Sequence, residues 1–99
     1  MAGAATIYAS PGGDLVEEAA YREALARQVR QSASAGETMI FQVEVEEQSS
    51  SWRLTVPDIP GVEARARKRQ EIEPAATTAI AAALAVPQRY FRVHLRFRA

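Results

Sequence analysis

A regular alternation of apolar and polar side chains is the feature of this sequence that most constrains its fold. Phe41, Val43 and Val45 are separated by single polar residues, and the segment from Phe91 to Phe97 has the same spacing, with arginine and histidine at the polar positions. Successive side chains of a β-strand point to opposite faces, so this spacing predicts strands with one buried and one solvated face. We therefore expect the body of the protein to be built on a sheet.

Two further strands are expected between these two. The segment 52–56, Trp-Arg-Leu-Thr-Val, also alternates, and the polar turn 48–51 would join it to the first strand as a β-hairpin. The segment 57–61, Pro-Asp-Ile-Pro-Gly, lacks amide donors at its prolines, so it must end the second strand and reverse the chain. A third and weaker strand, with small side chains on its inward face, is expected over 62–67.

An apolar helical stripe follows the third strand. Starting from Ile72, apolar residues fall at i, i+4, i+7, i+8, i+11 and i+12, which is the spacing of a helix with one buried face. Pro74 suits only the first turn, so the helix should begin near Gln70 and stop at Val86-Pro87. The element order is then β-β-β-α-β. A right-handed crossover would place the last strand parallel to the first, in the sheet order 3-2-1-4.

The first 37 residues differ in composition and in residue pattern from the body, residues 38–99. Residues 1–13 are small and polar, which favours a turn or an unfolded segment. A helix is predicted over about 14–31, and residues 32–36, Ser-Ala-Ser-Ala-Gly, are expected to end it as a flexible joint. The predicted fold is α+β: a sheet with one helix packed on one face, preceded by an extra N-terminal helix.

The N-terminal helix has two interpretations. Tyr21, Leu25 and Val29 recur every four residues and form a narrow apolar stripe. The helix either docks this stripe on the body or on a partner chain, or remains a partly ordered extension. Met39 is a candidate alternative start, because the strand pattern begins there.

Composition excludes several classes of protein. There is no cysteine, so there is no disulfide framework and no thiolate nucleophile or thiolate metal site. The longest apolar run, from Ala79 to Val86, is far shorter than the roughly 20 residues of a membrane-spanning helix. The first residues lack the pattern of a signal peptide. We expect a cytoplasmic protein that does not enter the membrane.

The residues offer little for catalysis or metal binding. Glu44 and Glu46 lie on one face of a strand, but a metal-dependent nuclease needs several converging carboxylates, and no adjoining strand clearly supplies them. His94 is the only histidine, and neither a nucleophile nor an orienting partner can be named for it. We expect no enzyme activity, no metal site and no cofactor.

Basic residues gather in the second half of the chain, although the whole chain has a formal net charge of zero. Arg65, Arg67 and Arg69 would project from one face of the third strand, where they could contact a phosphate backbone. Acidic Glu44 and Glu46, on the first strand, would have Arg53 on one side and Arg92 and Arg96 on the other, and cross-strand pairing would absorb much of the charge. A nucleic-acid partner is therefore not favoured.

The run Trp-Arg-Leu-Thr-Val-Pro-Asp-Ile-Pro-Gly-Val at 52–62, followed by a strand, a helix and a final strand, resembles HicB-family antitoxins. The similarity covers roughly residues 39–97, and the Val-Pro-Asp-Ile-Pro-Gly corner is its sharpest part. It implies a partial ribonuclease-H-like sheet that binds and blocks a small RNA-cleaving toxin, a HicA-like protein, without cleaving RNA itself. Many members carry a DNA-binding module after the last strand, whereas this chain ends at Ala99 and is similar to the short form of the domain.

These observations together predict a non-enzymatic, antitoxin-like protein-binding module. The alternative is a nucleic-acid-binding protein that uses the outward arginines of the sheet. The two strands at the edges of the sheet have unpaired amides, so a homo-oligomer is also expected. The candidate partner-binding residues are Arg53, Arg65, Arg67, Arg69, Arg92, His94 and Arg96.

Overall fold

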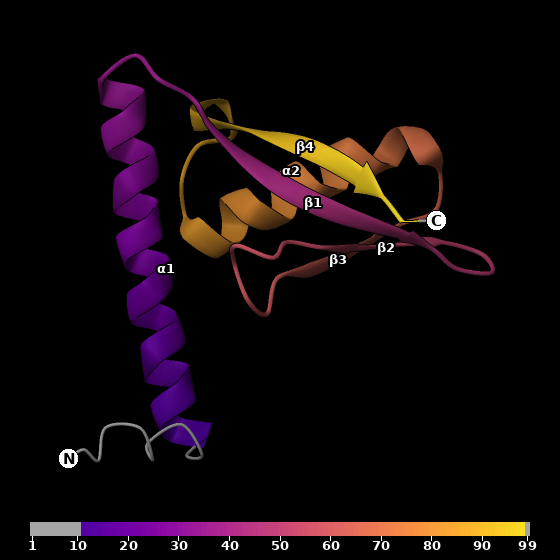
Figure 1. Cartoon of the computed structure of the whole chain (residues 1–99), viewed down its shortest axis with the longest axis horizontal. Coiled ribbons are helices and arrows are strands. Elements are labelled where there is room, and N and C mark those ends of the chain that lie inside the picture. Colours follow the sequence, from indigo (N-terminus) through magenta and orange to yellow (C-terminus); the bar gives the residue numbers. More distant parts are fainter. Residues whose placement is uncertain (1–10, 99) are drawn as a thin grey trace.

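The computed structural model of the chain describes residues 11–98. Two helices and a mixed four-stranded sheet make up an α+β fold, as the sequence predicts (Figure 1). The elements are α1 (Pro11–Ser34), β1 (Met39–Glu47), β2 (Trp52–Thr55), β3 (Glu63–Ala66), the 3-10 turn η2 (Arg69–Glu71), α2 (Ile72–Leu84), the 3-10 turn η3 (Gln88–Tyr90) and β4 (Phe91–Phe97).

The sheet has the order β3-β2-β1-β4. Strand β1 pairs antiparallel with β2 and parallel with β4, and β2 pairs antiparallel with β3. Val45 of β1 lies opposite Leu54 of β2 and Phe97 of β4. The central position of β1 explains why its inward side chains Phe41, Val43 and Val45 are buried, whereas Ile40, on the other face of the same strand, is 61% exposed. Strands β3 and β4 form the two edges of the sheet.

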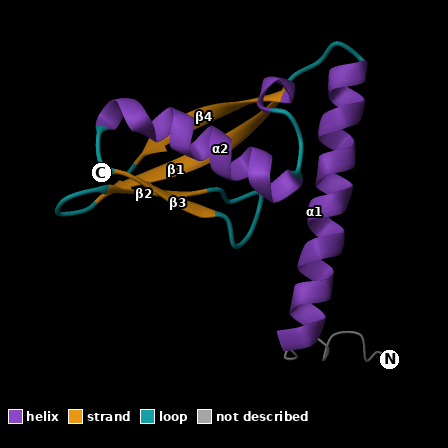
Figure 2. Ribbon diagram, turned by 180° about the vertical axis from the view of Figure 1, so that it is seen from behind, coloured by secondary structure: helices purple, strands orange, loops and turns teal. Residues whose placement is uncertain are grey.

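The core lies between one face of the sheet and α2. Phe41, Val43 and Val45 are buried against the helix, and their polar neighbours in β1 point to the other face, as the alternation predicts. The buried residues of α2 are spaced four apart, from Ile72 to Leu84, and form the stripe that packs on the sheet. Figure 2 shows α2 lying across this face, and Figure 1 shows the opposite face, which no helix of the described residues covers.

The boundaries of α2 follow from local chemistry. The helix begins at Ile72 and not at Gln70, because a turn of 3-10 helix precedes it, and Pro74 lies in its first turn as predicted. It ends at Ala85, which adopts the left-handed conformation with φ 55° and ψ 47° and donates its N–H to the carbonyl of Ala81. A residue in this conformation commonly ends a helix.

Helix α1 is longer than the sequence predicts. It spans Pro11–Ser34, so Pro11 to Gly13 are helical and residues 32–34 are not a flexible joint. The last turn continues until Gly36, whose φ of +80° is the left-handed conformation that glycine adopts without a steric cost. The N–H of Glu37 then donates to the carbonyl of Ser32, at 2.8 Å, and closes the helix end. The rest of the segment predicted as turn or unfolded, residues 1–10, lies outside the described residues.

The C-terminal half of α1 docks on the body. Ala26 and Val29 are buried and Leu25 is partly buried in the same apolar cluster as the sheet and α2. The N-terminal end of the helix projects past the body (Figure 1). Tyr21, which the sequence placed in the buried stripe, is 48% exposed. Its position in α1 lies beyond the apolar core, and only its hydroxyl reaches the body.

Candidate functional site

The face of the sheet that α2 leaves uncovered carries most of the candidate residues. Arg53 projects from β2 and Arg65 from β3, while Arg92, His94 and Arg96 form a row along β4. They alternate with the inward-facing residues of the same strands, so the period of the backbone alone places them on this face. The sequence predicted this grouping.

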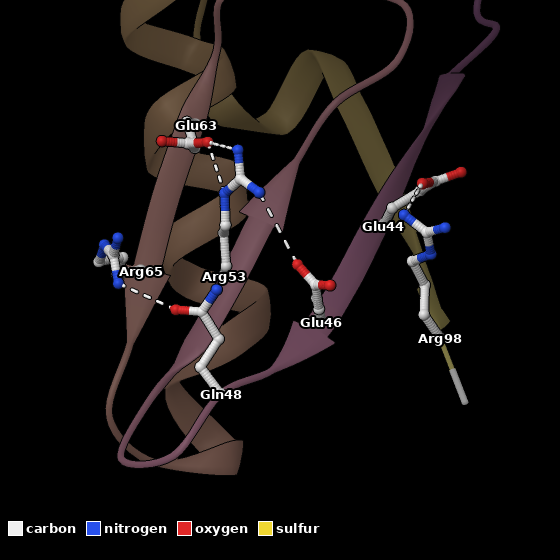
Figure 3. Close-up of polar contacts among 7 residues, drawn as sticks. All are labelled: Glu44, Glu46, Gln48, Arg53, Glu63, Arg65 and Arg98. Atoms are coloured by element: carbon white, nitrogen blue, oxygen red, sulfur yellow. Dashed lines mark hydrogen bonds and ion pairs between the residues drawn. The ribbon is translucent and has the colours of Figure 1, made fainter.

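Arg53 joins three strands on this face (Figure 3). Its Nε donates to Oε2 of Glu63 on β3 at 2.6 Å, and its Nη2 contacts the same oxygen. Its Nη1 lies 3.7 Å from Oε1 of Glu46 on β1. All three side chains are about half exposed, and an exposed ion pair contributes about 0 to 1 kcal/mol. The charge of Arg53 is thus largely balanced within the sheet.

Two further polar contacts connect the strands on this face. Arg65 donates a hydrogen bond to Oε1 of Gln48 at 3.2 Å (Figure 3). Glu44 pairs with Arg98, with Nη1 3.7 Å from Oε1. Arg96 lies directly opposite Glu44 in the register, as expected, but the ion pair of Glu44 is with Arg98. Arg98 is two residues further along than the position opposite Glu44, and a long side chain reaches such a diagonal cross-strand position.

The two arginines of the row on β4 keep their charge available. Among the described side chains, Arg92, His94 and Arg96 make neither an ion pair nor a side-chain hydrogen bond. All three are exposed. This row is therefore the part of the predicted site that is best suited to an acidic partner.

Arg69 is separated from the other candidates. It lies in η2 with its guanidinium carbon 4.6 Å from the ring centre of Phe97 and 5.9 Å from that of Trp52, and the two rings are edge to face at 5.9 Å. These rings lie on the α2 side of the sheet, so the prediction that Arg69 shares a face with Arg65 is wrong. The strand ends at Ala66, and the period of two ends with it. Arg67 is exposed in the bend that follows.

The proline-rich corner contacts α1, a feature that the sequence analysis missed. The hydroxyl of Tyr21 donates to the carbonyl of Asp58 at 2.7 Å, and Nη2 of Arg22 donates to the carbonyl of Pro60 at 3.0 Å. Ile59 is fully buried. Because the acceptors are main-chain carbonyls far away in the sequence, no residue pattern could have indicated these contacts.

The described residues offer no arrangement typical of a metal centre. Among the side chains that the structure describes, residues 17–98, no three of His, Asp or Glu come together as a group that could hold a metal ion. Glu44, Glu46 and Glu63, which share the uncovered face, are each paired with an arginine. In the same part of the chain, no helix is long and apolar enough to cross a membrane.

Comparison with protein-family models, with curated proteins and with solved structures gives no significant match to this chain. None of these comparisons identifies a relationship to HicB-family antitoxins, which stays a prediction from the residues of the corner and the order of the elements around it.

Proposed function

We propose that this protein is a non-enzymatic, HicB-like antitoxin module that binds a small RNA-cleaving toxin of the HicA type and blocks it, in the cytoplasm. The observation that carries the proposal is the corner 57–61. Its sequence is the sharpest part of the resemblance, its Ile59 is fully buried, and it connects β2 to β3 ahead of α2 and β4. The row of arginines on β4 supports a protein partner with an acidic surface.

The test is inhibition of RNA cleavage. A small ribonuclease encoded next to this gene would be purified and mixed with the full chain, and cleavage of a fluorescent oligoribonucleotide would be followed. We expect inhibition that is complete near one chain per toxin, and no cleavage by this chain alone. If the chain bound tightly to the ribonuclease and left its rate unchanged, or if it cleaved the RNA itself, the proposal would fail.

A nucleic-acid-binding function is the second candidate, favoured by the unpaired row on β4. The other charges of the face argue against a continuous phosphate track, because Arg53 is balanced by Glu46 and Glu63. Salt distinguishes the two functions. Binding to phosphates weakens steeply with salt because counterions are released, whereas a packed protein interface changes much less.

Self-association also stays a prediction. Two antiparallel β4 strands related by a two-fold axis at His94 would place Arg92 of one copy opposite Arg96 of the other, and like charges in directly opposite positions are destabilising. The short β3 edge has no such row. Size-exclusion chromatography with light scattering tests for an oligomer, and a mass equal to that of one chain at all concentrations would contradict it.

A further inference from the structure

Within the part of the chain that the structure describes, the outer edge of β4 presents unpaired main-chain groups. The N–H of Arg98 donates to the carbonyl of Val45 on β1 at 2.9 Å, and the register between β1 and β4 runs without interruption from Phe91 to Phe97. Since the amides of a strand point alternately to its two sides, those of the even-numbered residues face β1. The N–H and C=O groups of Val93, Leu95 and Phe97 therefore face the open edge.

The apolar side chains of the same residues are incompletely covered. Val93 and Leu95 are only partly buried, and Phe97 is 41% exposed, whereas Val43 and Val45 of the neighbouring strand are fully buried. Helix α2 packs more closely over β3 than over β4. A strand added beside β4 would thus find unpaired backbone and apolar surface on the α2 side.

The other side of this edge carries two arginines with a histidine between them. Arg92, His94 and Arg96 alternate with the apolar residues and point away from α2. Arginines along an edge oppose pairing with a second, identical edge. The same row is complementary to a strand with acidic side chains in its outward positions. The edge at β3 has only four residues and starts directly after the corner, so it has fewer main-chain groups with which an added strand could pair.

We propose that the open edge of β4 binds an extended segment of a partner protein by strand addition, with acidic side chains beside Arg92, His94 and Arg96 and apolar side chains beside Val93, Leu95 and Phe97. Main-chain hydrogen bonds would provide affinity, and the alternation of the partner segment would provide specificity. This inference rests on the proposed function only in taking the partner to be a protein.

A designed peptide tests the recognition. The probe is a fluorescein-labelled, end-capped peptide of sequence Gly-Glu-Val-Glu-Val-Glu-Val-Gly, and binding to the full chain is followed by fluorescence anisotropy. One control has the same composition with contiguous glutamates, and a second has lysine in place of glutamate. A third is methylated on alternate backbone nitrogens, so that it keeps its charge but cannot donate along one edge. We expect the alternating acidic peptide to bind at least about tenfold more tightly than each control.

Two variants of the protein locate the site. Leu95→Pro removes an N–H from the open edge without removing a hydrogen bond to β1, and proline is tolerated on such an edge. We expect this substitution to weaken binding of the alternating acidic peptide more than about tenfold. The double variant Arg92→Gln/Arg96→Gln should weaken binding of the peptide about two- to thirtyfold, because it removes two cross-strand charge pairs. Far-UV circular dichroism checks folding, and if Leu95→Pro fails to fold, the double variant and the methylated peptide carry the test.

The matched control is Arg27→Gln/Arg30→Gln, which makes the same change of charge on exposed positions of α1. It should bind the peptide as the unaltered chain does. Equal losses in the two double variants would mean that net charge alone attracts the peptide, which overturns the proposal. Equal binding of the methylated peptide would also overturn it, because strand addition requires those hydrogen bonds.

Other occupants of the edge give different results. A dimer of the unaltered chain that Leu95→Pro converts to a monomer would assign the edge to a second copy and overturn the proposal. Binding of a single-stranded oligoribonucleotide that depends on Arg92 and Arg96, with no binding of the peptide, would assign the row to phosphates and also overturn it.

The ribonuclease assay separates this inference from the proposed function. If the toxin is inhibited equally by the unaltered chain and by Leu95→Pro, the antitoxin function stands and the β4 edge is not its binding site. If no toxin is inhibited but the alternating peptide binds and depends on Leu95, the edge proposal stands and the antitoxin function fails.

Discussion

Replacing Val29 with alanine tests whether α1 belongs to the folded core. Val29 lies toward the C-terminal end of α1, and its side chain is completely buried in the cluster formed by the sheet and α2. Alanine is the best helix former, so the substitution should leave α1 intact as a helix. Any loss of stability would therefore report the packing of α1 against the body.

The expected loss is about 2 kcal/mol in the free energy of unfolding. Two buried methyl groups contribute about 1.6 kcal/mol, and the cavity left behind adds about 1 kcal/mol. The higher helix propensity of alanine returns about 0.5 kcal/mol. For a chain of this length, such a loss lowers Tm by about 8–16 °C.

Urea unfolding measures this loss. The fluorescence of Trp52, the single tryptophan, follows the body, and far-UV circular dichroism follows both helices. The control is Gln28→Ala, at the preceding and exposed position of α1, which should change stability by no more than about 0.5 kcal/mol. If Val29→Ala were as stable as this control, α1 would not be packed on the body, and the reasoning would be refuted.

Four further substitutions test local features by urea unfolding. Gly36 and Gly61 have φ of +80° and +89°, and a Cβ at Gly61 would also lie 3.0 Å from Nη2 of Arg22. Gly36→Ala should therefore lower the free energy of unfolding by about 1–2 kcal/mol, and Gly61→Ala should lower it more. A smaller loss for Gly61→Ala than for Gly36→Ala would contradict this reasoning. Ala85→Gly relieves the strain of a left-handed backbone conformation but adds conformational entropy to the unfolded chain. The net effect should be a gain of about 0.5 kcal/mol in the free energy of unfolding, and a decrease would contradict the reasoning. Arg53→Gln should lower the free energy of unfolding by no more than about 1 kcal/mol, and by less at high salt, because the ion pairs of Arg53 are exposed. A larger loss that does not depend on salt would contradict this prediction.

The strands and their faces could be predicted because their signal is local. Whether Phe41 points inward depends on the period of the backbone, and this period is visible in the spacing of apolar residues. The same argument placed Arg53 and Arg65 on the uncovered face, together with the row on β4. It failed at Arg69, because the strand ends three residues earlier and nothing in the local pattern marked the end.

The partners of the charged residues were only partly predictable. The sequence predicted that Arg53 lies beside Glu46 on the neighbouring strand, and the structure confirms that the two side chains form an ion pair. The closer contact of Arg53 with Glu63, and the pairing of Glu44 with Arg98, depend on which rotamers of long side chains are compatible with their neighbours on three strands. Rotamer choice is a property of the assembled sheet and has no counterpart in the spacing of residues.

The sequence by itself determined the α+β class, the positions of the strands, the stripe of α2 and the turn at the two prolines, because each depends on steric and hydrophobic rules that act over a few residues. Only the tertiary structure decided how far α1 extends and where it docks. Tyr21 and Arg22 hold main-chain carbonyls 37 and 38 residues further along the chain, contacts that exist only after the corner has folded beside the helix. The open edge of β4 was expected from the strand order, but its exposed apolar side and its unpaired arginines follow from where α2 lies and from which ion pairs form.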